Sequence, residues 1–158
     1  MKWNWFQLVG AIVLCQAAGG LGTVFTAKAI PGWYATLRRP SFNPPNWVFG
    51  PVWTFLYTLM GIALYRIWEL EPATSGRTLG LTLFFIQLAL NTFWTPLFFG
   101  LHALWLAFLE IILMWIAIAL TAYQFYPLDS LASWLLAPYL AWVSFAGLLN
   151  YAYARLNP

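Results

Sequence analysis

Four residues that can form hydrogen bonds lie on one face of an apolar segment in the middle of the chain. Gln87, Asn91, Trp94 and Thr95 follow one another at helical spacing, which places them on the same side of an α-helix. Two amides, an indole N–H and a hydroxyl can bind the carbonyl or carboxylate groups of a ligand, or they can join neighbouring helices. For Gln87 and Asn91 beside Trp94, the residue types indicate the wall of a polar and aromatic pocket at least as strongly as helix packing.

Tryptophan provides the second group of candidates, since the chain holds 11 Trp together with 13 Phe and 8 Tyr. Some of the Trp residues lie near the ends of apolar segments, as in the aromatic belts of membrane proteins. This group is Trp5, Trp47, Trp68 and Trp105. Others lie deeper, where an indole N–H needs a partner. This deeper group is Trp53, Trp94, Trp115 and Trp142. The deeper residues either pack helices together or line a cavity for a flat, largely apolar ligand.

Further polar residues fall within apolar segments, where burying them is costly. Glu110 is either protonated, paired or facing water, and Asn150 is best explained by a hydrogen bond between helices. Gln16, Thr23 and Thr26 share one segment with the small residues Gly19, Gly20 and Gly22. Small residues at this spacing let helices approach closely, either within one bundle or across a dimer seam.

The sequence contains no recognisable catalytic constellation. His102 is the single histidine and lies in a predicted turn, and no Cys/His set or glycine-rich phosphate loop is present. Glu69 and Glu71 are two residues apart beside Pro72, as in a solvated loop. We therefore predict no metal site, no required cofactor and no catalytic residue in the ordinary sense.

The composition defines the elements that must position these residues. Apolar residues make up 63% of the 158 and charged residues only 7%, against about 25% charged in ordinary soluble domains. Five runs are long enough to cross a bilayer. They are Trp5–Thr26, Trp47–Trp68, Leu79–Phe99, Ala103–Tyr126 and Leu131–Ala154. We predict an all-α integral membrane protein, a bundle of five transmembrane helices forming a single domain over residues 1–158.

The connection from Lys28 to Asn46 differs from the other three, which are short turns. It is rich in proline and contains Trp33, Tyr34 and Phe42, whereas disordered segments are poor in aromatic residues. We predict a long ordered loop between the first two helices that folds back onto the bundle.

The distribution of charge predicts the orientation of the chain. Five spans place the termini on opposite sides, and the side with the long loop and the C-terminus carries one more basic residue than the other, four against three. The first side carries Lys28, Arg38, Arg39 and Arg155, and the other carries Lys2, Arg66 and Arg77. The positive-inside rule then favours a cytoplasmic long loop and C-terminus. Basic residues are scattered rather than clustered, so nucleic acid is not an expected partner.

Several motifs in order along the chain resemble those of the translocator protein family, also called tryptophan-rich sensory proteins, peripheral benzodiazepine receptors or TspO/MBR. The resemblance covers nearly the whole chain. It rests on Trp33-Tyr34, Pro44-Pro45-x-Trp47, Gly50-Pro51-Val52-Trp53, Gln87-Leu88-Ala89-Leu90-Asn91-x-x-Trp94, Phe98-Phe99-Gly100, Pro138-Tyr139-Leu140-Ala141-Trp142 and Leu149-Asn150-Tyr151.

The resemblance implies a five-helix bundle, usually a homodimer, in a bacterial membrane or the mitochondrial outer membrane. It also implies a cavity under the first loop for porphyrins, haem, sterol-like lipids and synthetic ligands of the benzodiazepine-receptor type. The implied ligand-binding residues are Trp33, Tyr34, Trp53, Gln87, Asn91, Trp94, Trp105, Glu110, Trp142, Ala146 and Leu149. A loose sterol-recognition pattern falls on Leu148, Tyr151 and Arg155, although any last helix that closes with an interfacial Tyr and Arg matches it by chance.

These observations favour a membrane receptor or binding protein for tetrapyrroles and other flat hydrophobic ligands, with a transport or stress-sensing role. The resemblance also implies a rival function, light-dependent oxidative degradation of bound porphyrin. Trp53 and Trp142 occupy the positions that match the family's residues for this activity. A membrane transporter is a second rival. A structural assembly subunit is a third, and it would have no saturable ligand.

Overall fold

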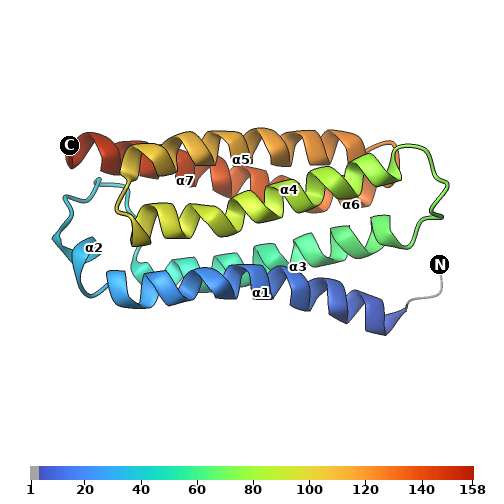
Figure 1. Cartoon of the computed structure of the whole chain (residues 1–158), viewed down its shortest axis with the longest axis horizontal. Coiled ribbons are helices and arrows are strands. Elements are labelled where there is room, and N and C mark those ends of the chain that lie inside the picture. The colour runs from blue at the N-terminus through green and yellow to red at the C-terminus, as the bar shows by residue number, and fades with distance from the viewer. Residues whose placement is uncertain (1–3) are drawn as a thin grey trace.

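A computed structural model describes residues 4–158, and all regular structure in this range is helical. The five apolar helices predicted from the sequence are confirmed. They span Trp5–Ala29, Asn46–Trp68, Arg77–Gly100, Leu104–Phe125 and Ser130–Leu156. The helices run alongside one another, and α1 begins at the end of the bundle opposite to the one where α7 ends (Figure 1). Lys2, which contributes to the charge balance, lies outside the described residues.

Helix α1 (Trp5–Ala29) packs closely against α3 (Phe49–Trp68) because glycine removes side chains from their interface. A Cβ atom added to Gly61 of α3 would lie 2.5 Å from the Cα atom of Ile12. Gly19 and Gly22 likewise face Tyr57 and Thr95. These glycines serve packing within one bundle, which was one of the two interpretations of the small-residue segment.

Helix α4 (Arg77–Thr95) follows a tight turn at Gly76, whose φ of 83° lies in the left-handed region that favours glycine. The guanidinium group of Arg77 donates to the carbonyl oxygens of Ile67 and Trp68 at 3.3 and 2.8 Å. These bonds satisfy carbonyl groups at the C-terminal end of α3 that have no partner within that helix.

Prolines divide two of the spans. The third span continues from α4 into a π-helical turn, η2 (Pro96–Gly100), because Pro96 has no N–H to continue the α-helical ladder. The fifth span is divided at Leu136 into α6 (Ser130–Leu135) and α7 (Ala137–Leu156). Pro138 explains this second break, since its ring conflicts with the carbonyl group four residues earlier.

Helix α5 (Leu104–Phe125) packs between α4 and α7. One end of the bundle, where α3 meets α6, is filled by large side chains. Phe84 and Phe125 stack with their ring centroids 6.1 Å apart, and Arg66 forms an ion pair with Asp129 at 2.7 Å. We call this region the packed end.

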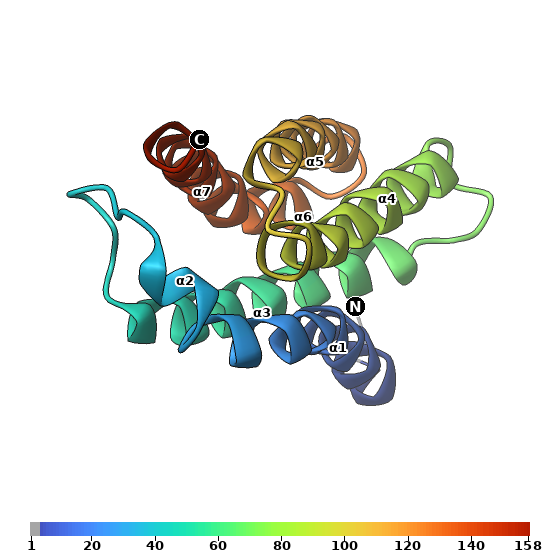
Figure 2. The ribbon, with the colours of Figure 1, turned by 60° about the vertical axis from the view of Figure 1, so that its left-hand side comes forward.

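The opposite end carries the connection between α1 and α3, and we call it the loop end. This connection holds a four-residue helix, α2 (Trp33–Thr36), and a 3-10 turn, η1 (Asn46–Val48). Figure 2 shows the connection reaching from α1 toward the C-terminal part of α7 and returning to the start of α3. The loop end therefore brings together residues from the first, second and fifth spans.

Candidate functional site

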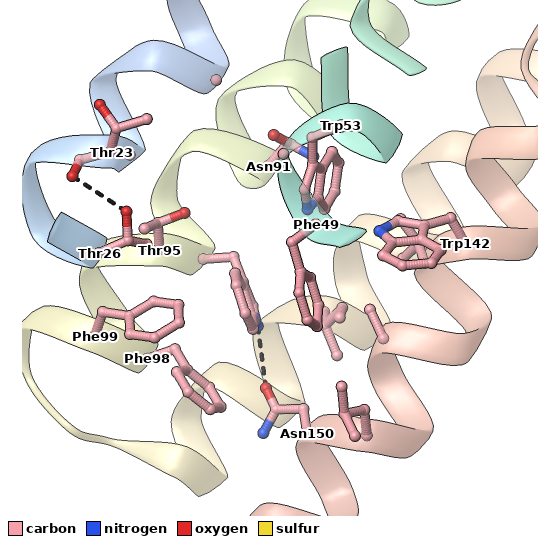
Figure 3. A pocket seen from close by; sticks show the side chains of 18 of the residues that line it. Thr23, Thr26, Phe49, Trp53, Asn91, Thr95, Phe98, Phe99, Trp142 and Asn150 are labelled. Atoms are coloured by element: carbon pink, nitrogen blue, oxygen red, sulfur yellow. Dashed lines mark hydrogen bonds between the residues drawn. The ribbon is translucent and has the colours of Figure 1, made fainter. Parts of the chain in front are cut away.

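A cavity of about 460 Å³ lies at the loop end, between α1, α3, α4, η2, α5 and α7. Its volume falls within the usual range for small-molecule sites, about 300–1,000 Å³. Figure 3 shows labelled side chains of α1, α3, α4, η2 and α7 around the cavity, with threonines on one side and the rings of Phe49, Trp53 and Trp142 facing them.

The α1 wall is formed mainly by glycine and threonine. Gly19, Gly20 and Gly22 all line the cavity. The space beside Gly19 and Gly22 is taken by Tyr57 and Thr95, whereas a Cβ atom at Gly20 would meet no atom within 4 Å. The hydroxyl groups of Thr23 and Thr26 donate to the carbonyl oxygens of Gly20 and Thr23 at 2.7 and 3.1 Å. These hydroxyl oxygens keep lone pairs that can accept a hydrogen bond from a ligand.

The facing wall is aromatic. Trp53 stacks on Tyr57 with centroids 5.4 Å apart, and Phe49 meets Trp142 edge to face at 5.8 Å. The indole N–H of Trp142 is buried and has no hydrogen-bond partner among the described residues. Figure 3 shows this nitrogen on the side of the ring that faces Trp53 and Phe49. The wall therefore offers flat apolar surfaces together with the free donor of Trp142.

Hydrogen bonds through Asn91 connect three helices beside the cavity. The Tyr57 hydroxyl donates to the Asn91 carbonyl oxygen, and the Asn91 amide donates to the Tyr139 hydroxyl at 2.9 Å. Asn91 also lines the cavity. It therefore positions two phenol rings at the inner end of the site.

Asn150 forms a second interhelical connection. Its side-chain oxygen accepts a hydrogen bond from the Trp94 indole at 3.0 Å, and its amide donates to the Leu104 carbonyl oxygen at 2.9 Å. The structure confirms the predicted hydrogen bond between helices for Asn150, and this bond fixes the Trp94 ring in the cavity wall.

Residues 30–48 contact the end of α7 through polar groups. The Tyr34 and Tyr153 hydroxyls lie 2.8 Å apart, and Tyr153 donates to the Asn43 side-chain oxygen at 3.0 Å. The Asn157 side chain accepts from the backbone N–H of Arg38 at 2.9 Å and donates to its carbonyl oxygen at 3.1 Å. The C-terminal end of α7 thus holds the connection at two points.

Most of the residues that the family resemblance assigns to ligand binding lie around this one cavity. They are Tyr34, Trp53, Asn91, Trp94, Trp142, Ala146 and Leu149. They come from α2, α3, α4 and α7, so the fold brings together positions far apart in the sequence.

Four other predicted residues lie outside the cavity lining. The side chains of Gln87 and Glu110 are buried within the bundle, and their polar atoms have no partner among the described residues. Trp33 stacks on His102 with centroids 3.9 Å apart. Trp105 is half exposed and packs against Phe108 and Tyr151. Helical spacing places Gln87 on the side of Asn91, but it lies one turn deeper than the cavity.

The sterol pattern lies on the outer face of the last helix. Leu148 and Tyr151 are exposed, and Tyr151 packs against Phe108 with centroids 5.3 Å apart. Arg155 is also exposed. The neighbouring Leu149 points the other way and lines the cavity.

Several lining residues were not predicted as ligand contacts. They include Gly19, Gly22, Phe49, Thr54, Tyr57, Phe98, Phe99, Met114 and Tyr153. Phenylalanine faces lipid as readily as a cavity, so residue type alone gave no signal. The run of glycines and threonines in α1 was the available signal, because small residues facing aromatic residues leave space. Among the described residues no cluster of three or more His, Cys, Asp or Glu could hold a metal ion.

Comparison with known proteins supports the sequence resemblance over nearly the whole chain. The profile of the TspO/MBR family matches residues 11–156. A tryptophan-rich protein TspO from Chlorobaculum tepidum is 44% identical over 147 residues, which cover 93% of each chain. A human translocator protein is 44% identical over 145 residues, 89% of this chain and 86% of the relative. A tryptophan-rich sensory protein from Cereibacter sphaeroides is 37% identical over 157 residues, 99% and 95% of the two chains.

Proposed function

This chain belongs to the TspO/MBR family, and we propose that its loop-end cavity binds flat hydrophobic ligands, above all tetrapyrroles such as porphyrins and haem. The observation that carries the proposal is a cavity of about 460 Å³ walled by Phe49, Trp53 and Trp142. Aromatic faces and edges favour a flat, polarisable ring system over a flexible chain. The same cavity is a candidate site for synthetic ligands of the benzodiazepine-receptor type.

The polar groups of the cavity can fix the orientation of a bound ligand. The free indole N–H of Trp142 can donate to a carbonyl or carboxylate oxygen of the ligand. The hydroxyl oxygens of Thr23 and Thr26 on the opposite wall can accept from a ligand N–H. A few polar groups in a mainly apolar site are the usual source of specificity.

We also propose that residues 30–48 act as an ordered lid over the cavity. The contacts of Tyr34 with Tyr153, of Asn43 with Tyr153 and of Arg38 with Asn157 support this role. The prolines of the segment restrict φ and reduce the entropy lost when it orders. With the cytoplasmic orientation favoured by the charge balance, the lid would face the cytoplasm, where binding could be sensed or ligand delivered.

Sterol-like lipids and a second copy of the chain are further proposed partners. The exposed Leu148, Tyr151 and Arg155 provide the loose sterol pattern on the outer face of α7. Exposed apolar residues such as Val13, Leu21 and Val24 of α1 offer a face for dimerisation. Cross-linking of the protein in nanodiscs would detect the homodimer, and a cross-linked dimer is the expected result.

The binding proposal is tested by titrating the purified protein in nanodiscs with protoporphyrin IX while following tryptophan fluorescence. Saturable quenching is expected. Trp142→Phe removes the free N–H and should weaken binding by about tenfold, a typical cost for a lost hydrogen bond. The matched control is Trp115→Phe, because the Trp115 indole bonds to Ser144 outside the cavity. Equal affinities in the two variants would remove Trp142 from the site.

A second candidate function is light-dependent oxidative degradation of bound porphyrin. It is favoured by the placement of two oxidisable indoles, Trp53 and Trp142, in the lining of one cavity. Illumination of the porphyrin complex in the presence of dioxygen should then bleach the porphyrin in the native protein and much more slowly in the Trp53→Phe, Trp142→Phe double variant. Equal bleaching in both proteins would exclude an enzyme-like role for these indoles.

A further inference from the structure

The contacts that hold the helices together differ from one interface to another. At the α1–α3 interface, the Gln16 amide donates to the Thr54 carbonyl and the Thr58 hydroxyl at 2.8 and 3.1 Å. At the α5–α7 interface, the Trp115 indole donates to the Ser144 hydroxyl at 2.8 Å. Separating either pair of helices would break hydrogen bonds inside the bilayer, where no water replaces them.

The interface between α3 and α7 contains aromatic contacts instead. Phe49 meets Trp142 with centroids 5.8 Å apart, and Trp53 meets Tyr139 at 6.2 Å. Within the described chain, no hydrogen bond or ion pair joins residues 46–57 directly to residues 137–156. Lipid tails can replace such contacts, because a bilayer solvates aromatic rings as well as a protein interior does.

Among the described residues, polar side-chain links from α3 to the fifth span, direct or through Asn91, lie on one side of this aromatic interface only. At the packed end, the ion pair between Arg66 and Asp129 ties α3 to the start of α6. Further along, Asn91 links Tyr57 to Tyr139. No such link follows between Phe49 and Trp142, and both of these residues line the cavity. A small separation of the helices would therefore open the cavity at the loop end first.

Two phenylalanines cover the outside of this opening. Phe42, from the irregular segment between α2 and η1, meets Phe145 of α7 edge to face at 6.2 Å. Phe145 in turn packs on Trp142 at 5.5 Å. Neither phenylalanine belongs to the cavity lining, and Phe42 is 49% exposed. Both rings can turn aside without breaking a hydrogen bond.

We propose that the aromatic seam formed by Phe42, Phe49, Trp142 and Phe145 is a lateral portal through which a hydrophobic ligand passes between the bilayer and the cavity. A flat apolar ligand concentrates in the hydrocarbon rather than in water. The route past the lid is held by the Tyr34–Tyr153 and Arg38–Asn157 hydrogen bonds, whereas the route through the seam crosses only ring contacts. This inference rests on the proposed function, because it assigns the path by which that ligand reaches its site.

The portal is tested by measuring binding rates rather than affinity alone. Protein in phosphatidylcholine nanodiscs is mixed with protoporphyrin IX in a stopped-flow instrument, and tryptophan quenching gives the association and dissociation rate constants. Phe145→Ala removes one of the two covering rings, and Phe145 itself is not a lining residue. Both rate constants should rise by about three- to tenfold while Kd stays within about twofold, since a gate changes the barrier and not the bound state.

Three further variants complete the design. Phe42→Ala removes the other covering ring from an exposed site and should behave like Phe145→Ala, even if the latter folds poorly. Phe108→Ala is the matched control, because Phe108 packs against Trp105 and Tyr151 away from the seam. Asn157→Ala loosens the lid. Rates within about twofold of the native values are expected for these last two variants.

The outcomes separate the portal from the function on which it rests. Saturable binding by the native protein with unchanged rates in both Phe42→Ala and Phe145→Ala would overturn the portal alone. The portal would also be overturned if Asn157→Ala raised both rate constants and the phenylalanine variants did not. A third contradicting result would be phenylalanine variants that raise Kd without raising the association rate constant. Absence of saturable binding by the native protein would overturn the proposed function and the portal with it.

Discussion

The two ends of this bundle use the same helices for different purposes. At the packed end, large buried side chains such as Met60, Phe84 and Phe125 fill the interior. At the loop end, α1 lines a cavity with glycine and threonine, and aromatic residues of α3, α4 and α7 form its other walls. The contrast is one of side-chain size: α1 presents small residues to the cavity, whereas large side chains fill the packed end.

The ends also differ in how they are held. The packed end relies on close backbone approach at Gly61 and on the Arg66–Asp129 ion pair. The loop end relies on amide and phenol hydrogen bonds around Asn91, Asn150 and Tyr153. Variants at the packed end should therefore change stability alone, whereas variants at the loop end should also change ligand binding.

The largest expected effect is that of Asn91→Leu. Loss of the amide leaves the Tyr57 and Tyr139 hydroxyls without this partner, which costs about 1–3 kcal/mol for each buried group. The melting temperature should fall, and porphyrin affinity should fall with it, because Tyr57 supports the Trp53 ring. A melting curve without ligand and a binding isotherm in nanodiscs measure the two effects. The control is Thr92→Val, since the Thr92 hydroxyl donates to the Leu88 carbonyl within its own helix. A destabilised Asn91→Leu protein with native affinity would make Asn91 purely structural.

Alanine substitutions at two glycines of neighbouring helices, Gly61 of α3 and Gly20 of α1, should change stability in opposite directions. Gly61→Ala forces a Cβ atom to within 2.5 Å of the Ile12 backbone, and overpacking of this kind costs about 1–3 kcal/mol. Gly20→Ala meets no atom within 4 Å, and the gain in helix propensity should stabilise the protein by about 0.5–1 kcal/mol. Thermal melting of the two variants measures the difference. Equal melting temperatures would contradict the close α1–α3 packing.

Breaking the ion pair of the packed end should have a smaller effect on the stability of the protein. Arg66→Met keeps Asp129 as the N-cap of α6, where its side chain accepts from the Ala132 N–H, but removes its charge partner. Because both side chains retain some exposure, we expect the free energy of unfolding to fall by about 1–2 kcal/mol. The Kd for protoporphyrin IX should not change. Arg155→Met, at an exposed site, is the control. A large rise in Kd for Arg66→Met would show that the two ends do not behave independently.

The smallest expected effect is at the lid. Asn157→Ala removes two hydrogen bonds to the Arg38 backbone. Since these groups are exposed, the loss of stability should be below about 1 kcal/mol. Hydrogen exchange of the amides in residues 37–45 should accelerate, because the segment loses its tie to α7. Exchange as slow as in the native protein would mean that other contacts hold the lid.

The sequence predicted the fold well because a bilayer imposes a simple constraint. Five runs of about 20 apolar residues can only be spanning helices, and the proline at position 138 does not interrupt the fifth enough to change that number. The bounds were less exact: α1 continues past Thr26 to Ala29, since Lys28 near a helix C-terminus is favourable there. The division of two spans by Pro96 and Pro138 also depends on local geometry that apolar character does not encode.

The site was predictable only in part. Helical spacing placed Asn91, Trp94 and Thr95 on one face, and all three line the cavity. The same spacing included Gln87, which lies deeper, because periodicity gives the direction of a side chain and not the depth at which a cavity ends. Phe49, Tyr57 and Phe98 had no distinguishing signal, since aromatic residues are abundant on every face of this chain. The contribution of Gly19 and Gly22 required knowing which large residues face them.

The central claim, that the loop end binds the ligand and the packed end does not, is tested most directly by fluorine NMR. The protein is labelled with 5-fluorotryptophan, each resonance is assigned by a Trp→Phe substitution, and protoporphyrin IX is added in nanodiscs. A bound porphyrin ring current should shift the resonances of Trp53, Trp94 and Trp142, which line the cavity. The resonances of Trp68, Trp115 and Trp134, which are exposed elsewhere on the bundle, should stay in place. Shifts confined to this second group would contradict the account.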